Sequence, residues 1–343
     1  MTVNDSLSLK AGPLVCSRRA FFRRFASCSA HLFLTAAAGS SIMRRMYAAG
    51  AKGKVVLTEP FGRLEKLADG VWALVSTPLD GHRQTLANGG IIAGRDGVMA
   101  VEGLYTIEGA AWFSETARRL TGKRPTHVVV THYHSDHCSG LAGYQNGNEP
   151  LQVISTDMTR SLLLEAESRK REESDSPVKR RRLLLPDTVI TDLSKPTEID
   201  LGGRLVRIVA RDGHTLSDLT IELEDPRVVF CGDLVWNGMF PNFVDAAPSK
   251  FSAQCKSLLR DQKAVYVPGH GSIADAQGMK PYLDLLDDVE HTVRNALKKG
   301  LPIEEAARVY KVPEKLGEWT MFSPSYYGRA FEAWARELKE ERK

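Results

Sequence analysis

The chain has 343 residues, of which 43% are apolar and 26% are charged, a balance typical of soluble globular proteins. It contains no run approaching the roughly eighteen apolar residues of a membrane-spanning helix, so none is expected. The five cysteines include no Cys-x-x-Cys pair, which argues against a disulfide framework and against a zinc ribbon.

The formal net charge of +4 arises in the first 51 residues, which carry seven basic side chains and one acid. The remaining chain has 39 basic and 41 acidic residues, a net charge of −2. A generally basic body that binds nucleic acid is therefore not supported, and we expect a small-molecule substrate.

The first 51 residues have the features of an export signal. The run Ser17-Arg18-Arg19-Ala20-Phe21-Phe22 is followed by a modestly apolar stretch from Phe25 to Ala38 and then by small residues. This pattern resembles a twin-arginine signal, which a receptor reads before the segment is removed. The alternative is an exposed basic helix. We predict a signal over residues 1–51 and an exported, periplasmic protein.

From Val55 onward, short β-rich runs alternate with helical stretches. In the first half, the pattern predicts strands over Val71–Ser76, Gly90–Ala93, Val98–Glu102, His127–Thr131 and Leu151–Ser155. It predicts helices over Ile107–Leu120, closing at Gly122, and from about Asp157 to Leu185 with an interruption near Pro177.

The second half repeats the alternation. It predicts strands over Arg204–Ala210, Leu219–Glu224, Val228–Cys231 and Ala264–Val267, and helices near Ser249–Arg260 and Gly278–Lys299. Residues 301–343 form a mostly helical extension. Two β-rich halves with flanking helices indicate a layered α/β sandwich. Because no linker divides residues 52–343, we expect them to form one domain.

A dense group of metal-binding side chains follows the apolar strand His127–Val130. Within Thr131-His132-Tyr133-His134-Ser135-Asp136-His137, four good ligands fall in six residues. A buried cluster of this kind would be costly unless it were paired or bound to metal. The loop can direct His132 and His134 to one ion and Asp136 and His137 to a neighbouring ion.

Three further motifs each follow a predicted strand, and glycine beside each ligand allows the backbone to turn sharply. They are Asp212-Gly213-His214-Thr215, Gly232-Asp233 and Pro268-Gly269-His270-Gly271. A single histidine is more often structural than a ligand, but four such segments at strand ends reverse that expectation. Imidazole and carboxylate ligands suit zinc, with iron or manganese as alternatives.

Taken together, HxHxDH, GHT, GD and GHG resemble the metallo-β-lactamase superfamily from about residue 55 onward. The resemblance implies a four-layer αββα sandwich with two divalent metal ions at one edge. It also implies the ligands. His132, His134 and His214 would hold the first ion, Asp136, His137 and His270 would hold the second, and Asp233 would bridge them.

Two departures argue against antibiotic hydrolysis as the native role. The cysteine-containing β-lactamases carry cysteine at the position of Asp233 and a substrate-gripping lysine three residues later, where this chain has Trp236. A bridging aspartate is typical of the glyoxalase-II-like thioesterases. The sequence Gly232–Trp236, with Asp245 downstream, is similar to exported zinc hydrolases of the quinoprotein-relay type.

Two metal ions can share one water and lower its pKa from about 15.7 towards neutrality. We therefore expect a bridging hydroxide to cleave an ester, thioester, lactone or amide, with Asp136 as the catalytic residue that moves the proton. The alternatives are a mononuclear-iron enzyme resembling persulfide dioxygenases, a true β-lactamase, and a metal-binding relay protein without turnover.

Several other residues carry weaker expectations. Thr131, Thr215 and Ser135 are placed to orient imidazoles. His82 is expected to be a solvated loop residue, Glu102 to fix a loop, and Trp236 to line the pocket or simply to pack. The basic run Lys179–Arg182 is read as a solvated face, since acidic residues share its predicted helix.

Overall fold

The computed structural model describes residues 53–77, 82–147, 149–172 and 184–340. The predicted signal over residues 1–51 and the basic run 179–182 lie outside the described residues. None of the helices within the described ranges is long and apolar enough to cross a membrane.

An eight-stranded sheet forms from the first half of the chain, and its strands lie in sequence order. Neighbours are antiparallel from β1 to β5 and parallel from β5 to β8. The strands are β1 (Lys54–Glu59), β2 (Gly62–Ala68), β3 (Val71–Ser76), β4 (Gly89–Ala93), β5 (Val98–Val101), β6 (His127–Val129), β7 (Gln152–Thr156) and β8 (Thr188–Ile190).

A six-stranded sheet forms from the second half in the order β16-β14-β12-β11-β10-β9. Only the β12–β14 pair is parallel. The strands are β9 (Thr197–Asp200), β10 (Leu205–Ala210), β11 (Leu219–Leu223), β12 (Val228–Phe230), β14 (Val265–Val267) and β16 (Ala274–Asp275). A separate short pair joins β13 (Trp236–Asn237) to β15 (His270–Gly271).

The two sheets pack face to face over an apolar core. Val71, Ile92 and Met99 of the first sheet meet Ile208 and Ile221 of the second, all essentially inaccessible to solvent. The sheets approach closely at Gly90, where a Cβ atom would collide with the Phe230 ring. Glycine is therefore required at this point of the interface.

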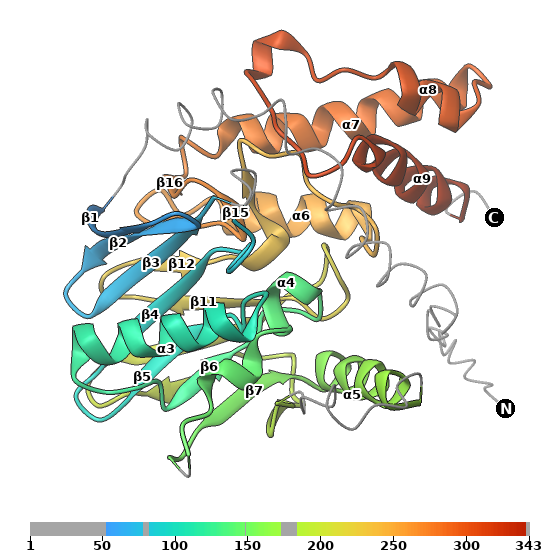
Figure 1. Cartoon of the computed structure of the whole chain (residues 1–343). Helices are drawn as coiled ribbons and strands as arrows, with labels where there is room; N and C mark the ends of the chain where they lie inside the picture. Colours follow the sequence, from blue (N-terminus) through green and yellow to red (C-terminus); the bar gives the residue numbers. More distant parts are fainter. Residues whose placement is uncertain (1–52, 78–81, 148, 173–183, 341–343) are drawn as a thin grey trace, which may run out of the picture.

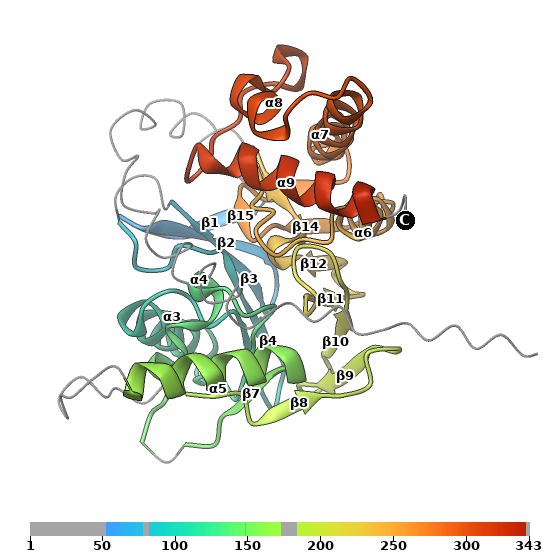
Figure 2. The same cartoon turned by 90° about the vertical axis from the view of Figure 1, so that its right-hand side faces the viewer.

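Helices cover the outer face of each sheet (Figures 1 and 2). On the first sheet lie α3 (Ile107–Thr121) and α5 (Asp157–Glu172), and on the second lie α6 (Pro248–Leu258), α7 (Lys280–Lys298), α8 (Ile303–Val309) and α9 (Ser325–Glu340). Helix α3 begins at the capping residue Thr106 and ends at Gly122, which adopts the left-handed conformation. The resulting αββα order confirms the predicted fold class.

Two sequence expectations need correction, and a third holds. The long helix predicted to Leu185 ends in the described residues at Glu172, and Leu184 and Leu185 are not helical. The C-terminal extension is mostly helical in its described residues, as expected, with a non-helical stretch between α8 and α9 that holds one short turn at Glu314–Leu316. Strands β1, β2, β8 and β9 and the two-residue strands β13, β15 and β16 were not among the predicted strands.

Candidate metal centre

The HxHxDH motif leaves the first sheet directly after β6 and turns into a single helical turn, α4 (Ser135–Cys138). His132 and His134 lie on the connecting loop, and Asp136 and His137 lie on α4. The three imidazoles are buried, whereas the Asp136 side chain is 20% exposed, the largest exposure among the predicted ligands. Asp136 therefore marks the side of the centre that solvent reaches.

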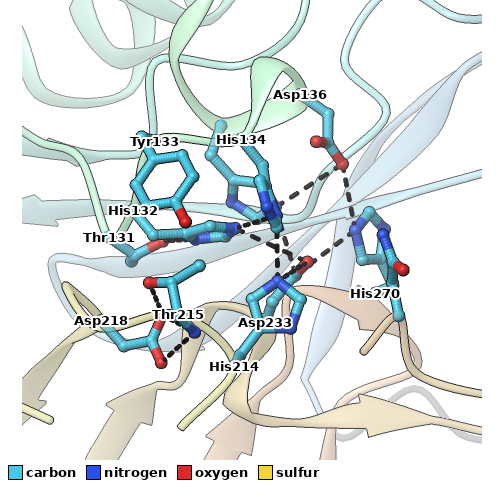
Figure 3. Close-up of polar contacts among 12 residues, drawn as sticks. Thr131, His132, Tyr133, His134, Asp136, His214, Thr215, Asp218, Asp233 and His270 are labelled. Atoms are coloured by element: carbon cyan, nitrogen blue, oxygen red, sulfur yellow. Dashed lines mark hydrogen bonds and ion pairs between the residues drawn. The ribbon is translucent and has the colours of Figure 1, made fainter. Parts of the chain in front are cut away.

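The other predicted ligands come from loops of the second sheet. His214 follows β10, Asp233 follows β12 in a tight turn, and His270 begins β15 after β14. Gly269 allows this convergence, because a Cβ atom there would collide with Asp233 Oδ1. The structure thus brings all seven predicted residues together at one edge between the two sheets, and Figure 3 labels each of them except His137.

The seven side chains form two clusters. In the first, His134 Nδ1 lies 3.1 Å from His132 Nε2 and 3.0 Å from His214 Nε2. Asp233 Oδ2 completes it, 3.4 Å from His214 Nε2 and 3.7 Å from His132 Nε2. One ligand atom from each of the four residues lies within 4.8 Å of the others.

The second cluster contains Asp136, His137 and His270. Asp136 Oδ2 lies 3.1 Å from His270 Nε2 and 3.6 Å from His137 Nε2. The other oxygen of Asp233, Oδ1, lies 3.1 Å from His137 Nε2 and 3.4 Å from His270 Nε2. The Asp233 carboxylate therefore presents one oxygen to each cluster.

The donor set fits two divalent cations. Among the described residues, Nε2 of His137, Nε2 of His270 and Oδ1 of Asp233 are buried and make no hydrogen bond. Buried polar atoms without such a partner are costly, and a cation between them would satisfy all three. Three nitrogens with one oxygen, and two nitrogens with two oxygens, are donor sets that zinc accepts.

Oxygen atoms behind three imidazoles set the orientation of their rings. Glu102 Oε1 lies 3.0 Å from His137 Nδ1, and Asp245 Oδ2 lies 3.1 Å from His134 Nε2. Thr131 Oγ1 lies 3.0 Å from His132 Nδ1. Such partners fix the nitrogen that faces a metal. The Thr131 prediction agrees with this geometry, whereas Glu102 and Asp245 were not predicted to hold imidazoles.

The remaining two imidazoles are held by packing. The Trp236 ring lies over His270 with centroids 4.2 Å apart, and Phe322 approaches the same imidazole edge-on at 5.2 Å. His214 packs edge-on against Phe251. The Trp236 indole N–H donates to the backbone oxygen of Asp233, which fixes the ring beside the shared carboxylate.

Burial and neighbouring charges divide the imidazoles into two groups. Burial lowers the pKa of His214 to about 3 and holds that of His132 well below its usual value. Burial also opposes protonation of His270 and His137. The neighbouring carboxylates together outweigh burial, with Asp233 contributing most, and they raise the pKa of His270 to about 9 and that of His137 well above its usual value. Without a bound cation, His132 and His214 are therefore neutral at neutral pH, whereas His137 and His270 are protonated.

Other predicted residues have different partners. Thr215 donates through its backbone and hydroxyl to the buried carboxylate of Asp218 rather than to an imidazole. His82 is exposed, as expected for a solvated loop residue. Trp236 is buried and packs on the predicted ligand His270, which agrees with the expectation that it packs. Cys138 and Cys231 are buried, as small core residues are.

The family model of the metallo-beta-lactamase superfamily matches residues 86–270, more than half of the chain. The chain therefore belongs to the metallo-beta-lactamase superfamily. It is a hydrolase of this superfamily, whose members use divalent metal ions.

Curated relatives differ in their activities. The chain is 25% identical to the 2,4-dinitroanisole O-demethylase subunit beta of Nocardioides sp. (strain JS1661), over 69% of this chain and 67% of that protein. It is 22% identical to a metallo-beta-lactamase type 2 of Bacillus sp. (strain 170), over 65% of this chain and 81% of that protein. It is 24% identical to the hydroxyacylglutathione hydrolase of Acidiphilium cryptum (strain JF-5), over 56% of this chain and 64% of that protein.

Solved structures share the fold at low identity. The sec-alkylsulfatase of Pseudomonas sp. superposes with a TM-score of 0.60 and 16% identity, covering 97% of this chain and 64% of that one. A double mutant of a sec-alkylsulfatase matches over 80% of this chain but only 50% of its own length, with a TM-score of 0.59 and 18% identity. A metallo-beta-lactamase from Pontibacter korlensis superposes with a TM-score of 0.53 and 20% identity, covering 66% of this chain and 98% of that one. The chain spans only half to two thirds of the sulfatases' length.

Proposed function

We propose that the chain uses two divalent metal ions to hydrolyse an ester, thioester, lactone or amide of a small molecule. Zinc is the metal we favour. One observation carries this proposal: the Asp233 carboxylate presents Oδ2 to one cluster of imidazoles and Oδ1 to the other. His132, His134 and His214 would hold one ion, and Asp136, His137 and His270 would hold the other. When bound, such a pair supplies Lewis acidity and hydroxide at neutral pH.

The side chains around the centre would admit the substrate, transfer a proton, orient the imidazoles and exclude water. Asp136 is the most exposed predicted ligand, so substrate would approach from its side. Its carboxylate can accept a hydrogen bond from the attacking water and pass a proton to the leaving group. Glu102 and Asp245 would keep their imidazoles aligned through the reaction. The buried aromatic rings of Trp236 and Phe322 would exclude water from the side of His270.

The residues at the centre also narrow the substrate class. Asp233 stands where the cysteine-containing β-lactamases have cysteine, and Trp236 stands where they have a cationic side chain. The similarity to a hydroxyacylglutathione hydrolase supports thioesters as the first class to test. We therefore favour thioester, ester and lactone substrates over antibiotics.

A substrate panel combined with metal analysis tests the proposal. The purified protein, loaded with zinc, iron or manganese, would be assayed on chromogenic esters, thioesters, lactones and a cephalosporin. Two zinc ions per chain with ester, thioester or lactone turnover would support it. Turnover of the cephalosporin alone would instead identify a β-lactamase. One iron ion per chain with sulfur-dependent oxygen uptake would identify a dioxygenase instead of a hydrolase. A protein that binds metal but turns over none of the substrates would indicate a relay role.

We also propose that residues 1–51 direct export of the folded chain and that residues 52–343 form the hydrolase domain. The paired arginines Arg18 and Arg19 and the weakly apolar stretch after them support this reading. Replacing both arginines with lysine should trap the protein inside the cell, as measured by fractionation. Unchanged export of the double variant would contradict it.

A further inference from the structure

Asn88, the residue before β4, is buried and bonds to the segment that carries His270. Its side-chain amide donates to the backbone oxygens of Pro268 at 2.9 Å and Gly271 at 2.8 Å. Its backbone N–H donates to the backbone oxygen of Gly269 at 2.8 Å. One residue at the start of a first-sheet strand therefore bonds to three carbonyl groups around His270.

The amide of Asn88 has one favourable orientation. Its Oδ1 accepts a hydrogen bond from the backbone N–H of Ser76 at 2.8 Å, and Ser76 is the last residue of β3. A flipped amide would turn its oxygen towards two carbonyls and its N–H groups towards another N–H, so the network assigns the orientation. Asn88 thus links the first sheet to residues 268–271, which we call the His270 segment.

His270 depends on its backbone because its imidazole lacks a polar partner behind the ring. An imidazole that binds a metal usually has an oxygen behind its other nitrogen, as His134 and His137 do. Nδ1 of His270 is buried and makes no hydrogen bond to any described residue. Trp236 and Phe322 pack against the ring, but packing is less directional than a hydrogen bond. The backbone of the His270 segment therefore sets where Nε2 points.

The second cluster combines residues that follow both sheets. Asp136 and His137 follow β6 of the first sheet, whereas His270 follows β14 of the second. Gly269 donates to two backbone oxygens of the turn after β12, at 2.8 and 3.0 Å, and these bonds hold the segment within the second half of the chain. The bonds from Asn88 tie the same segment to the sheet that supplies the other two ligands.

We propose that Asn88 is a positioning residue for the metal ion of the second cluster. Its three hydrogen bonds set the distance between His270 and the two ligands that the first sheet supplies. Asn88 acts through the backbone of the His270 segment and donates no atom to the metal. The inference rests on the proposed function, in which this cluster binds an ion.

Zinc binding to the metal-free protein tests this role. Asn88→Ala removes both side-chain bonds to the His270 segment and should weaken the ion of the second cluster about tenfold or more, leaving the other ion within about twofold. Asn88→Asp fills the same space and still accepts from Ser76, but it offers at most one O–H to two carbonyls, so its affinity for the second ion should also fall. Competition with a chromogenic chelator measures both affinities, and elemental analysis counts the bound ions.

A double-mutant cycle with His270→Ala assigns the loss to one cluster. His270→Ala removes a ligand of the second cluster, so the ion that remains is the one held by the first cluster. Adding Asn88→Ala should then leave the affinity for that ion unchanged, because the positioned imidazole is already absent. A general structural role would weaken the remaining ion in the double variant as well, and that result would overturn the proposal.

Ser76→Ala is the matched control beside Asn88. It removes a buried hydroxyl that lies 2.7 Å from Thr85 Oγ1 and donates to the backbone oxygen of Ala87 at 2.6 Å, while the backbone N–H can still donate to Asn88. This variant should lose stability in urea unfolding but bind both ions normally. Equal losses of both ions in Asn88→Ala, or unchanged affinities in both Asn88 variants, would contradict the proposal. If Asn88→Ala does not fold, Asn88→Asp decides the question alone.

Metal binding separates this proposal from the proposed function. A natural protein that binds two zinc ions and hydrolyses none of the tested substrates would refute hydrolysis, while the affinities of the Asn88 variants would still decide the role of Asn88. Turnover with two ions and no selective loss in either variant would overturn the role of Asn88 alone. A natural protein that holds only one zinc ion at saturation would overturn both.

Discussion

Glu102 Oε1 lies 3.0 Å from Nδ1 of His137 and accepts a hydrogen bond from the Thr131 hydroxyl at 2.6 Å. The Thr131 backbone N–H donates to the other oxygen, Oε2, at 3.2 Å. Glu102 has a positive φ of 79°, a conformation that non-glycine residues rarely adopt. This backbone geometry carries the carboxylate from the end of β5 to the far side of the His137 ring.

Replacing Glu102 with glutamine should weaken metal binding at the cluster that contains His137. A neutral amide can still accept one hydrogen bond, but it no longer polarises the imidazole, and loss of such a partner costs about 10–100-fold in affinity or activity. Competition with a chromogenic chelator would measure the loss for each ion. Glu115→Gln, which affects an ion pair on the exposed side of α3, should leave both affinities unchanged. Equal loss at both ions would argue against a local role.

Replacing Asp233 with alanine should empty both clusters, because this carboxylate contributes an oxygen to each. We expect metal content well below one ion per chain and loss of hydrolysis, measured by elemental analysis beside an activity assay. Asp69→Ala provides the control, since the Asp69 side chain is 97% exposed. A variant that keeps two ions would show that Asp233 is no bridge.

Replacing Gly269 with alanine should disturb the centre without removing any predicted ligand. The added methyl group would meet Asp233 Oδ1 and the Gly232 backbone, whose carbonyl carbon lies 2.8 Å from the Cβ position. Overpacking of this kind costs about 1–3 kcal/mol, and here it would also displace the shared carboxylate.

Metal content and urea unfolding would measure both effects of Gly269→Ala. Gly328→Ala is the matched control, because nothing lies within 4 Å of that Cβ position in α9. The control should keep its metal and gain up to about 1 kcal/mol of stability from its higher helix propensity. Normal metal content in Gly269→Ala would mean that the loop can shift at little cost.

The stability of the metal-free protein should depend on pH through Asp218. Burial raises the pKa of this carboxyl to about 7, against a usual value of 3.8. Because the folded-state pKa is the higher one, the contribution of Asp218 is greatest below about pH 4 and is lost as the pH rises towards 7. Full loss corresponds to about 4 kcal/mol.

Urea unfolding of the metal-free protein and of Asp218→Asn between pH 4 and pH 8 would test this dependence. The asparagine variant can still accept a hydrogen bond from Thr215 and has no proton to lose. The natural protein should therefore lose stability relative to the variant as the pH rises. A constant difference across the range would exclude the proposed titration.

The ligand positions could be predicted because each lies within a few residues of a short apolar strand. The apolar strand shows where the chain leaves the sheet, and the glycine beside the ligand shows where the backbone turns sharply. Their partners could not be predicted in this way. Asp245 is 111 residues from His134 in the sequence, and Glu102 reaches His137 only because β5 pairs with β6.

The missed strand β2 shows a second limit of pattern reading. Its sequence Gly62–Ala68 contains Glu65, which is fully buried and pairs with Arg63 at 2.7 Å. A buried charge breaks the expected alternation of apolar and polar residues. The helix predicted up to Leu185 failed for a different reason: helical composition alone does not set where a helix ends.

The two clusters draw their residues from both sheets, since His132 and His134 follow β6 whereas His214 follows β10 and Asp233 follows β12. A cation held by such a set would act as a cross-link between the two halves of the chain. Separating the sheets would then require breaking metal–ligand bonds as well as exposing the apolar core. Chelation should therefore speed unfolding and proteolysis, so retention of metal would govern how long the protein survives in a protease-rich environment.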